Sequence, residues 1–128
     1  YKTEQGEMVR SKSELIIANI LYKNREMLKY KYERPLELMI EGHTQTIYPD
    51  FTILNVRTGK FVYWEHAGRM DDPRYAANFV KKINTYIDNE IIPGKDLIVT
   101  YETVNSPIVI QHIQLQIEIL KKNMIISP

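Results

Sequence analysis

The sequence has 128 residues, of which 44% are hydrophobic and 26% are charged, so it suits one compact globular domain and argues against disorder. The 17 basic and 16 acidic residues leave a net charge of +1, which gives no overall electrostatic footprint for nucleic acid, so any basic patch must be local. Because the sequence has no cysteine, disulfide scaffolds, zinc ribbons and cysteine nucleophiles are excluded.

The sequence carries no recognisable targeting or membrane signal. No stretch approaches the ~20 apolar residues that a membrane-spanning helix needs, and the polar start YKTEQGEMVRSKSE lacks the pattern of a signal peptide. Since the first residue is Tyr1 rather than Met, we expect an excised domain or a trimmed chain. We expect a cytoplasmic protein with no membrane partner, with a single domain over residues 1–128 and a polar arm over residues 1–10.

The first predicted element is a buried helix that begins at Ser11. The run SKSE has the pattern of a capping box, in which the Ser11 hydroxyl accepts a backbone N–H near Glu14 and the Glu14 side chain reaches back. The following run LIIANILYKN is apolar on nearly every face, which is typical of a buried helix. We expect this helix to end near Asn24.

Residues 30–67 are predicted to form an antiparallel three-stranded meander. The segment KYKYERPLELMI has the pattern of an extended strand interrupted by Pro35, and Gly42 marks a turn after it. The segment TQTIYPDFTILNV is rich in β-forming residues, and residues 57–60 (RTGK) have the composition of a hairpin turn. The third strand lies in KFVYWEHAG and is ended by Gly68.

A second helix is predicted after the meander. Asp71 or Asp72 can cap it, and Pro73 suits its first turn. Four apolar side chains then recur at helical spacing and define one stripe: Tyr75, Phe79, Ile83 and Tyr86.

The last predicted elements are a short, largely buried strand in DLIVTYETV, after a Pro93-Gly94 turn, and a final helix that begins at Ser106-Pro107. One face of that helix is apolar and consists of Val109, Ile113, Ile117, Leu120 and Met124. The order helix, three strands, helix, strand, helix predicts an α/β sandwich with a mixed sheet.

Two of the predicted strands each place a carboxylate inside an apolar run. Asp50 lies in YPDFTI and Glu65 lies in VYWEH, and the hairpin between them brings both acids toward the same end, register permitting. Adjacent buried carboxylates repel and lose hydration, and a divalent cation such as Mg²⁺ removes both costs. Such a cation also activates water for phosphodiester hydrolysis. The alternative is that the two acids face solvent or pair with Arg or Lys.

The stretch YPDFTI, followed by Glu65 in YWEHAG, resembles the PD-(D/E)XK signature of restriction-endonuclease-like nucleases. Together with RSKSE and a helix that starts at DDP, these strings are similar to nuclease domains attached to bacterial and phage DNA helicases and defence proteins. The resemblance spans residues 10–104 and implies an α/β (α+β) αβββαβα core, with a mixed four-stranded sheet flanked by helices. It also implies a nuclease dependent on Mg²⁺ or Mn²⁺ that acts on nucleic acid, with DNA the expected substrate.

The resemblance also implies roles for individual residues. Asp50 and Glu65 match the two metal ligands, and Glu14 matches a glutamate that lies close to the metal or its waters. For Glu14 a purely structural capping role is an equal alternative. The usual lysine two residues after the second acid is absent, because Ala67 stands there. Lys82 is the best substitute for positioning the nucleophile, and a surface lysine is its alternative.

Other functions remain open from the sequence. His66 points away from Glu65 in a regular strand, so packing or hydrogen bonding is expected, with a general base as the alternative. Ala67 at the lysine position favours a catalytically inactive module for DNA binding or protein assembly. A plain α/β interaction domain would be supported if Asp50 and Glu65 pointed to opposite sheet faces. A larger DNA-processing protein is an expected partner, and dimerisation is left open.

Overall fold

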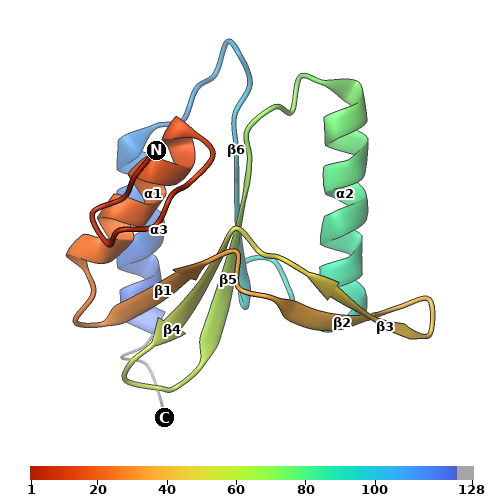
Figure 1. Cartoon of the computed structure of the whole chain (residues 1–128), viewed down its shortest axis with the longest axis horizontal. Coiled ribbons are helices and arrows are strands. Elements are labelled where there is room, and N and C mark those ends of the chain that lie inside the picture. Colours follow the sequence, from red (N-terminus) through yellow and green to blue (C-terminus); the bar gives the residue numbers. More distant parts are fainter. Residues whose placement is uncertain (124–128) are drawn as a thin grey trace.

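A mixed four-stranded sheet lies at the centre of the computed structural model, which describes residues 1–123 (Figure 1). Its strands, in spatial order, are β1 (Leu28–Tyr32), β4 (Phe51–Asn55), β5 (Phe61–Ala67) and β6 (Leu97–Tyr101). β4 pairs antiparallel with both β1 and β5, and β6 joins the other edge of β5 in parallel. Two core clusters lie on opposite faces of this sheet, because neighbouring residues of β5 and of β6 belong to different clusters.

Three helices cover the two faces. The helices α1 (Lys12–Lys23) and α3 (Ile110–Asn123) pack on one face, and α2 (Pro73–Asp88) lies beside the other (Figure 1). The α1–α3 cluster is large and includes Phe51 and Trp64, both of which are fully buried. The α2 cluster is small, since only three of its side chains are buried: Leu38, Tyr86 and Leu97. The helix α2 is therefore held mainly through its C-terminal half.

The predicted start and end of α1 are confirmed. The Ser11 hydroxyl accepts from the backbone N of Glu14 at 3.1 Å, and Glu14 Oε1 accepts from the backbone N of Ser11 at 3.1 Å, which completes the capping box. Asn24 is the C-cap residue. The buried face of the helix carries Ile17, Ala18 and Leu21.

Residues 1–10 do not form a free polar arm. Lys2 and Met8 form an isolated antiparallel bridge, and the Thr3 and Val9 side chains are buried. The Tyr30 hydroxyl on β1 donates to the Glu7 carboxylate at 3.1 Å. A few buried contacts thus fold this segment back on the sheet, although its polar composition favoured exposure.

The predicted antiparallel three-stranded meander over residues 30–67 is confirmed in part, since β1, β4 and β5 pair antiparallel in chain order but are not consecutive strands. A separate antiparallel hairpin, β2 (Leu36–Ile40) and β3 (His43–Ile47), is inserted between β1 and β4. Pro35 and the positive φ of Glu33 separate β1 from β2, so a segment expected to be one interrupted strand forms two strands in different sheets. At the turn, Glu41 and Gly42 have φ of 52° and 79°, the backbone of a tight two-residue hairpin.

The start of α2 agrees with its prediction, whereas the start of α3 does not. Asp72 caps α2 by accepting from the backbone N of Arg74 and of Tyr75, with Pro73 in the first turn. The last helix begins at Ile110 rather than at Ser106-Pro107, because the preceding residues make other contacts. Thr103 and Ser106 exchange backbone hydrogen bonds, and the Glu102 carboxylate accepts from the backbone N of Ile108 at 3.2 Å.

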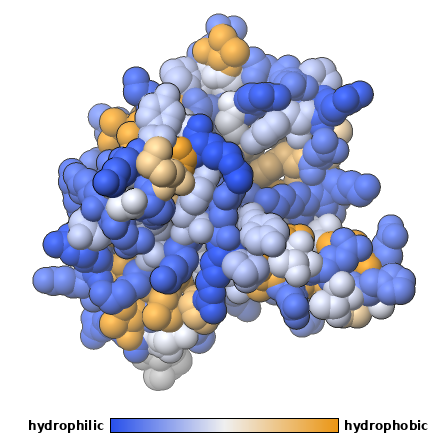
Figure 2. All heavy atoms as spheres, viewed as in Figure 1, coloured by the Kyte–Doolittle hydropathy of each residue, from blue (hydrophilic) through white to orange (hydrophobic). Residues whose placement is uncertain are grey.

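Three side chains of the predicted apolar face of α3 are buried: Ile113, Ile117 and Leu120. Val109 precedes the helix and is exposed, and Met124 lies outside the described residues. The fold is therefore α+β, with a mixed four-stranded sheet and three helices within residues 1–123. Within that part of the chain, no helix combines the length and apolar character needed to cross a membrane. The face drawn in Figure 2 is largely hydrophilic, with hydrophobic side chains in small separate spots.

A candidate active site between the sheet and α2

The structure brings Asp50 and Glu65 together. In the β4–β5 register Phe51 is opposite Trp64, so Asp50, directly before β4, lies next to Glu65. Both acids line one pocket of about 210 Å³ between the sheet and α2. The arrangement that would have favoured a plain interaction domain, with the acids on opposite sheet faces, is not found.

Glu65 is held by two donors from α2. Its side chain is only 3% exposed. Lys82 Nζ lies 3.0 Å from Oε1 and 2.9 Å from Oε2, and the Tyr86 hydroxyl donates to Oε2 at 2.5 Å. Burial raises the pKa of Glu65 above its ordinary value, while the charge of Lys82 and the hydrogen bonds from Lys82 and Tyr86 oppose that rise.

Asp50 is less well compensated. Its Oδ2 accepts from the backbone N of His66 at 2.7 Å, and within residues 1–123 no donor reaches Oδ1 and no cation pairs with the carboxylate. Burial raises the pKa of Asp50 to about 7, and the negative charge of Glu65 adds to the rise. The His66 N–H and the charge of Lys82 only partly oppose these effects. Negative charge at this end of the pocket is thus poorly neutralised by the protein.

Lys82 lies at the pocket because of the rotation of α2. It is four residues before Tyr86, so both side chains reach Glu65 from one face of the helix. The Lys82 side chain is 34% exposed, which leaves its ammonium accessible from the pocket. The next-door Lys81 is exposed and makes no contact with either acid.

Glu14 fills its capping role. Its Oε1 accepts from the backbone N of Arg10 and of Ser11 and from the Tyr32 hydroxyl, each at 3.1 Å. Its charge contributes a small rise to the pKa of both Asp50 and Glu65, so it lies near them. Across the described part of the chain, no three acidic, histidine or cysteine side chains are grouped as metal ligands. The carboxylate pair is therefore the candidate ligand set that the structure brings together.

His66 points to the opposite face of the sheet from Glu65, as expected for a regular strand. Its side chain is 2% exposed, with Nδ1 2.7 Å from Thr100 Oγ1 and Nε2 2.7 Å from Glu102 Oε1. Ser13 of α1 also donates to Glu102. These hydrogen bonds connect β5, β6 and α1. They hold His66 in place, and the backbone N–H of His66 donates to Asp50 on the other side of the sheet.

Glu102, which no motif in the sequence singles out, is a hydrogen-bonded neighbour of His66 in the structure. Burial raises its pKa, but the hydrogen bonds from Ser13 and His66 outweigh burial and hold the pKa below its ordinary value. The sequence held only part of the signal for this contact, because the pairing of β5 with β6 is also needed. Alternation along the chain places Thr100 of β6 and the following Glu102 on one side, and in the β5–β6 register His66 is opposite Thr100.

The four side chains of the apolar stripe on α2 lie in two different environments. Ile83 and Tyr86 pack in the α2 core cluster, whereas Tyr75 and Phe79 belong to neither core cluster and instead line the pocket. Asn78 lines it as well. The pocket thus has an acidic end formed by the sheet and an aromatic wall formed by the first half of α2.

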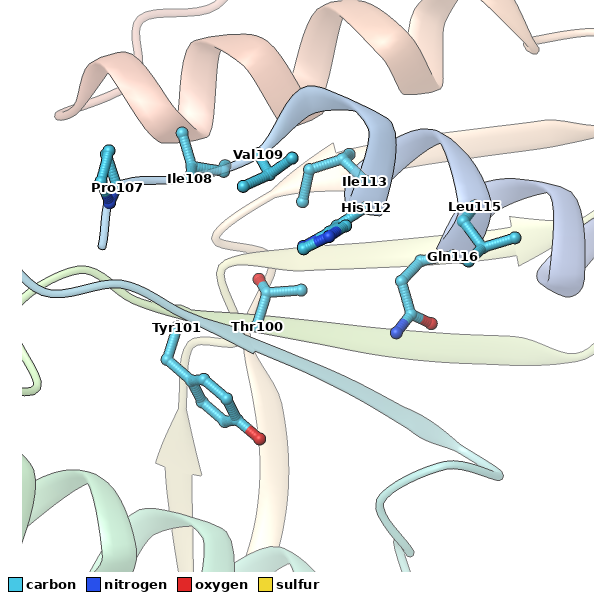
Figure 3. Close-up of a pocket in the computed structure, with 9 residues that line it drawn as sticks. All are labelled: Thr100, Tyr101, Pro107, Ile108, Val109, His112, Ile113, Leu115 and Gln116. Carbon is cyan, nitrogen blue, oxygen red and sulfur yellow. The ribbon is translucent and has the colours of Figure 1, made fainter.

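A second pocket, of about 270 Å³, lies between β6 and α3 (Figure 3). Thr100 of β6 points toward His112 and Gln116 of α3, whereas the side chain of Tyr101 points to the other side of the strand (Figure 3). No carboxylate lines it, so it lacks the paired acids that distinguish the pocket beside α2.

Comparison with known proteins finds no matching family model, no matching curated protein and no matching solved structure.

Proposed function

We propose that this chain is a metal-dependent nuclease domain with a restriction-endonuclease-like core, which hydrolyses phosphodiester bonds of nucleic acid, with DNA the expected substrate. One observation carries the proposal: Asp50 and Glu65 lie side by side in one pocket, and Asp50 has no cation partner in residues 1–123. The PD-(D/E)XK-like pattern around these two acids gives the same assignment from the sequence.

The two acids fit a hard divalent cation. Asp50 keeps one carboxylate oxygen free of protein donors in the described residues, and the pKa values of both acids are raised, chiefly by burial, so negative charge is unfavourable in the metal-free pocket. Mg²⁺ and Mn²⁺ accept one or two carboxylates and complete their shells with water and phosphate oxygens. Glu14 would act through such waters. A cation held by Asp50 and Glu65 would polarise the phosphate and lower the pKa of a bound water.

Lys82 takes the place of the lysine that the family pattern puts at Ala67. Ala67 is buried and shares a sheet face with Glu65, so the position that carries the lysine in the family pattern brings no cation to the pocket here. From α2 the Lys82 ammonium reaches Glu65 and remains accessible from the pocket. It can therefore donate a hydrogen bond to a water or a phosphate oxygen and offset the charge that develops during hydrolysis.

The order of the elements supports the restriction-endonuclease-like assignment. If the inserted β2–β3 hairpin is set aside, the chain runs helix, three antiparallel strands, helix, parallel strand, helix. Asp50 then lies directly before β4 and Glu65 lies on β5, and these are the two central strands of the sheet.

Cleavage assays test the proposal. Wild-type protein should cut DNA in the presence of Mg²⁺ or Mn²⁺ and should stop when EDTA is added, and Asp50→Asn should lower the rate by at least ~100-fold. Asp88→Asn is the matched control, because it makes the same chemical change at an exposed position at the end of α2. Wild-type rates for Asp50→Asn would show that the site is misassigned. No cleavage of single- or double-stranded DNA or RNA by the wild type would refute the nuclease.

A catalytically inactive module for DNA binding or protein assembly is the second candidate. The absence of a lysine at Ala67 and the closed Lys82–Glu65 ion pair favour it. The inactive module does not explain why Asp50 is poorly neutralised, because two neighbouring acids that repel each other lower the stability of a domain that binds no metal.

A further inference from the structure

We infer that the pocket beside Asp50 and Glu65 takes one unpaired nucleobase, stacked on the rings of Phe79 and Tyr75, so that the substrate is single-stranded nucleic acid. The inference deepens the proposed function and rests on it, since the base would belong to a nucleotide next to the bond that is cut.

The two rings are available for a ligand. Tyr75 and Phe79 lie one helical turn apart on the same face of α2, and both line the pocket. Neither ring is part of a core cluster, although Ile83 and Tyr86 on the same stripe are. Partly exposed rings that do not pack in the core can stack on a planar ligand, and every nucleobase offers such a face.

The size and the remaining wall of the pocket suit one base. A volume of about 210 Å³ equals that of about seven liquid waters, which is the scale of a single planar base. Asn78 lines the pocket with an amide that offers both a donor and an acceptor to a base edge. A base in a duplex would first have to leave its stack, at a cost of a few kcal/mol, so an unpaired strand is favoured.

Positive charge lies where the sugar-phosphate chain would run. The Arg69 guanidinium lies over the Tyr75 ring, 5.4 Å from its centre, and pairs with Asp72 at 3.3 Å, but its side chain is still 69% exposed and accessible to a phosphate. The Gly68 backbone N donates to the Tyr75 hydroxyl at 3.1 Å, which fixes the ring beside this cation. With Lys82 on the other side of the aromatic wall, both the base and the phosphates of a strand meet complementary groups.

Binding measurements separate this inference from the cleavage reaction. The probe is a fluorescein-labelled oligothymidylate, followed by anisotropy with Ca²⁺ in place of Mg²⁺. Phe79→Leu, which removes the ring and keeps an apolar side chain, should weaken binding by about 10-fold. Val80→Ala is the matched control, because Val80 is adjacent in sequence but 54% exposed, and it should bind as the wild type does. Unlabelled duplex of equal length should compete poorly, and thymidine monophosphate should compete only at much higher concentration.

Equal affinity of Phe79→Leu and Val80→Ala, each with an unchanged melting temperature, would overturn the inference, as would duplex competing as well as the single strand. If Phe79 governs single-strand binding but no metal supports cleavage, the base pocket stands and the nuclease fails. If both strand forms are cut equally well, with no effect of Phe79→Leu, the nuclease stands and the base pocket fails.

Discussion

At Asp50 the cost of burial and the repulsion from Glu65 act in the same direction. Together they raise the pKa of Asp50 to about 7, although the His66 N–H and Lys82 favour the charged form. The metal-free protein therefore carries a carboxylate that is destabilising once it is ionised, near neutral pH. Such a site is suited to a cation, because a bound cation offsets the cost of burial and the repulsion between the two carboxylates, which the protein groups offset only in part.

This balance gives a pH-dependent prediction for Asp50→Asn. Unfolded Asp50 loses its proton near pH 3.8 and folded Asp50 near pH 7, so the folded state holds more protons in between and its stability falls as pH rises through that window. Asparagine stays neutral and can still accept from the His66 N–H. Urea denaturation in EDTA should give equal stabilities for the two proteins at pH 4. At pH 8 Asp50→Asn should be more stable, by on the order of 2–4 kcal/mol.

Asp88→Asn provides the reference for that experiment, since Asp88 is exposed and should show no comparable pH-dependent gain. A pH profile of Asp50→Asn that runs parallel to the wild-type profile would mean that Asp50 is not destabilised by burial.

At the scale of elements, the function depends on how α2 is rotated and held. Its C-terminal end is tied to the inserted hairpin, because the Asn89 side chain accepts from the backbone N of Met39 at 2.8 Å and donates to the backbone O of Met39 at 2.9 Å. Tyr86 anchors the same end to Glu65. The N-terminal half of the helix is left free of core contacts, and that half forms the aromatic wall of the pocket.

The rotation of α2 predicts that substitution of Lys82 lowers activity and that substitution of the adjacent Lys81 does not. Lys82→Ala should lower kcat by on the order of 100-fold while changing Mn²⁺ affinity much less, because Lys82 would act on the reacting groups. Lys81→Ala should leave both unchanged, since its side chain points to solvent. Initial rates measured against Mn²⁺ concentration separate the two parameters. Equal losses of kcat and of metal affinity in Lys82→Ala, or a similar effect of Lys81→Ala, would contradict the proposed role.

At the scale of the whole molecule, local signals predicted local structure well. The capping pattern from Ser11 to Glu14 and the Asp72-Pro73 start fixed two helix beginnings, and periodicity identified the buried residues of α3. The sequence did not predict the inserted β2–β3 hairpin, because Pro35 is compatible both with an irregularity within one strand and with a break between two strands. Whether that segment pairs with its neighbour or forms its own sheet depends on distant packing against α2.

The candidate site was predictable where local regularities of a strand or a helix decide which residues share a face. Strand alternation and the hairpin turn were enough to place Asp50 beside Glu65, and helical spacing was enough to choose Lys82 over Lys81. The Glu102 contact to His66 needed the pairing of β5 with β6, which is a crossover between distant segments. The sequence could not show that Tyr75 and Phe79 line a pocket, because an apolar stripe on a helix has the same spacing whether it faces a core or a pocket.

The most direct test of the central claim, that Asp50 and Glu65 form a divalent cation site, is calorimetric titration of the protein with Mn²⁺ at pH 8. We expect one site per chain in the wild type and in Asp88→Asn, at least ~10-fold weaker binding in Asp50→Asn, and weaker wild-type binding at pH 6, where Asp50, with a pKa of about 7, is mostly protonated. No binding by the wild type, or equal binding by Asp50→Asn, would contradict the claim and remove the basis for the nuclease.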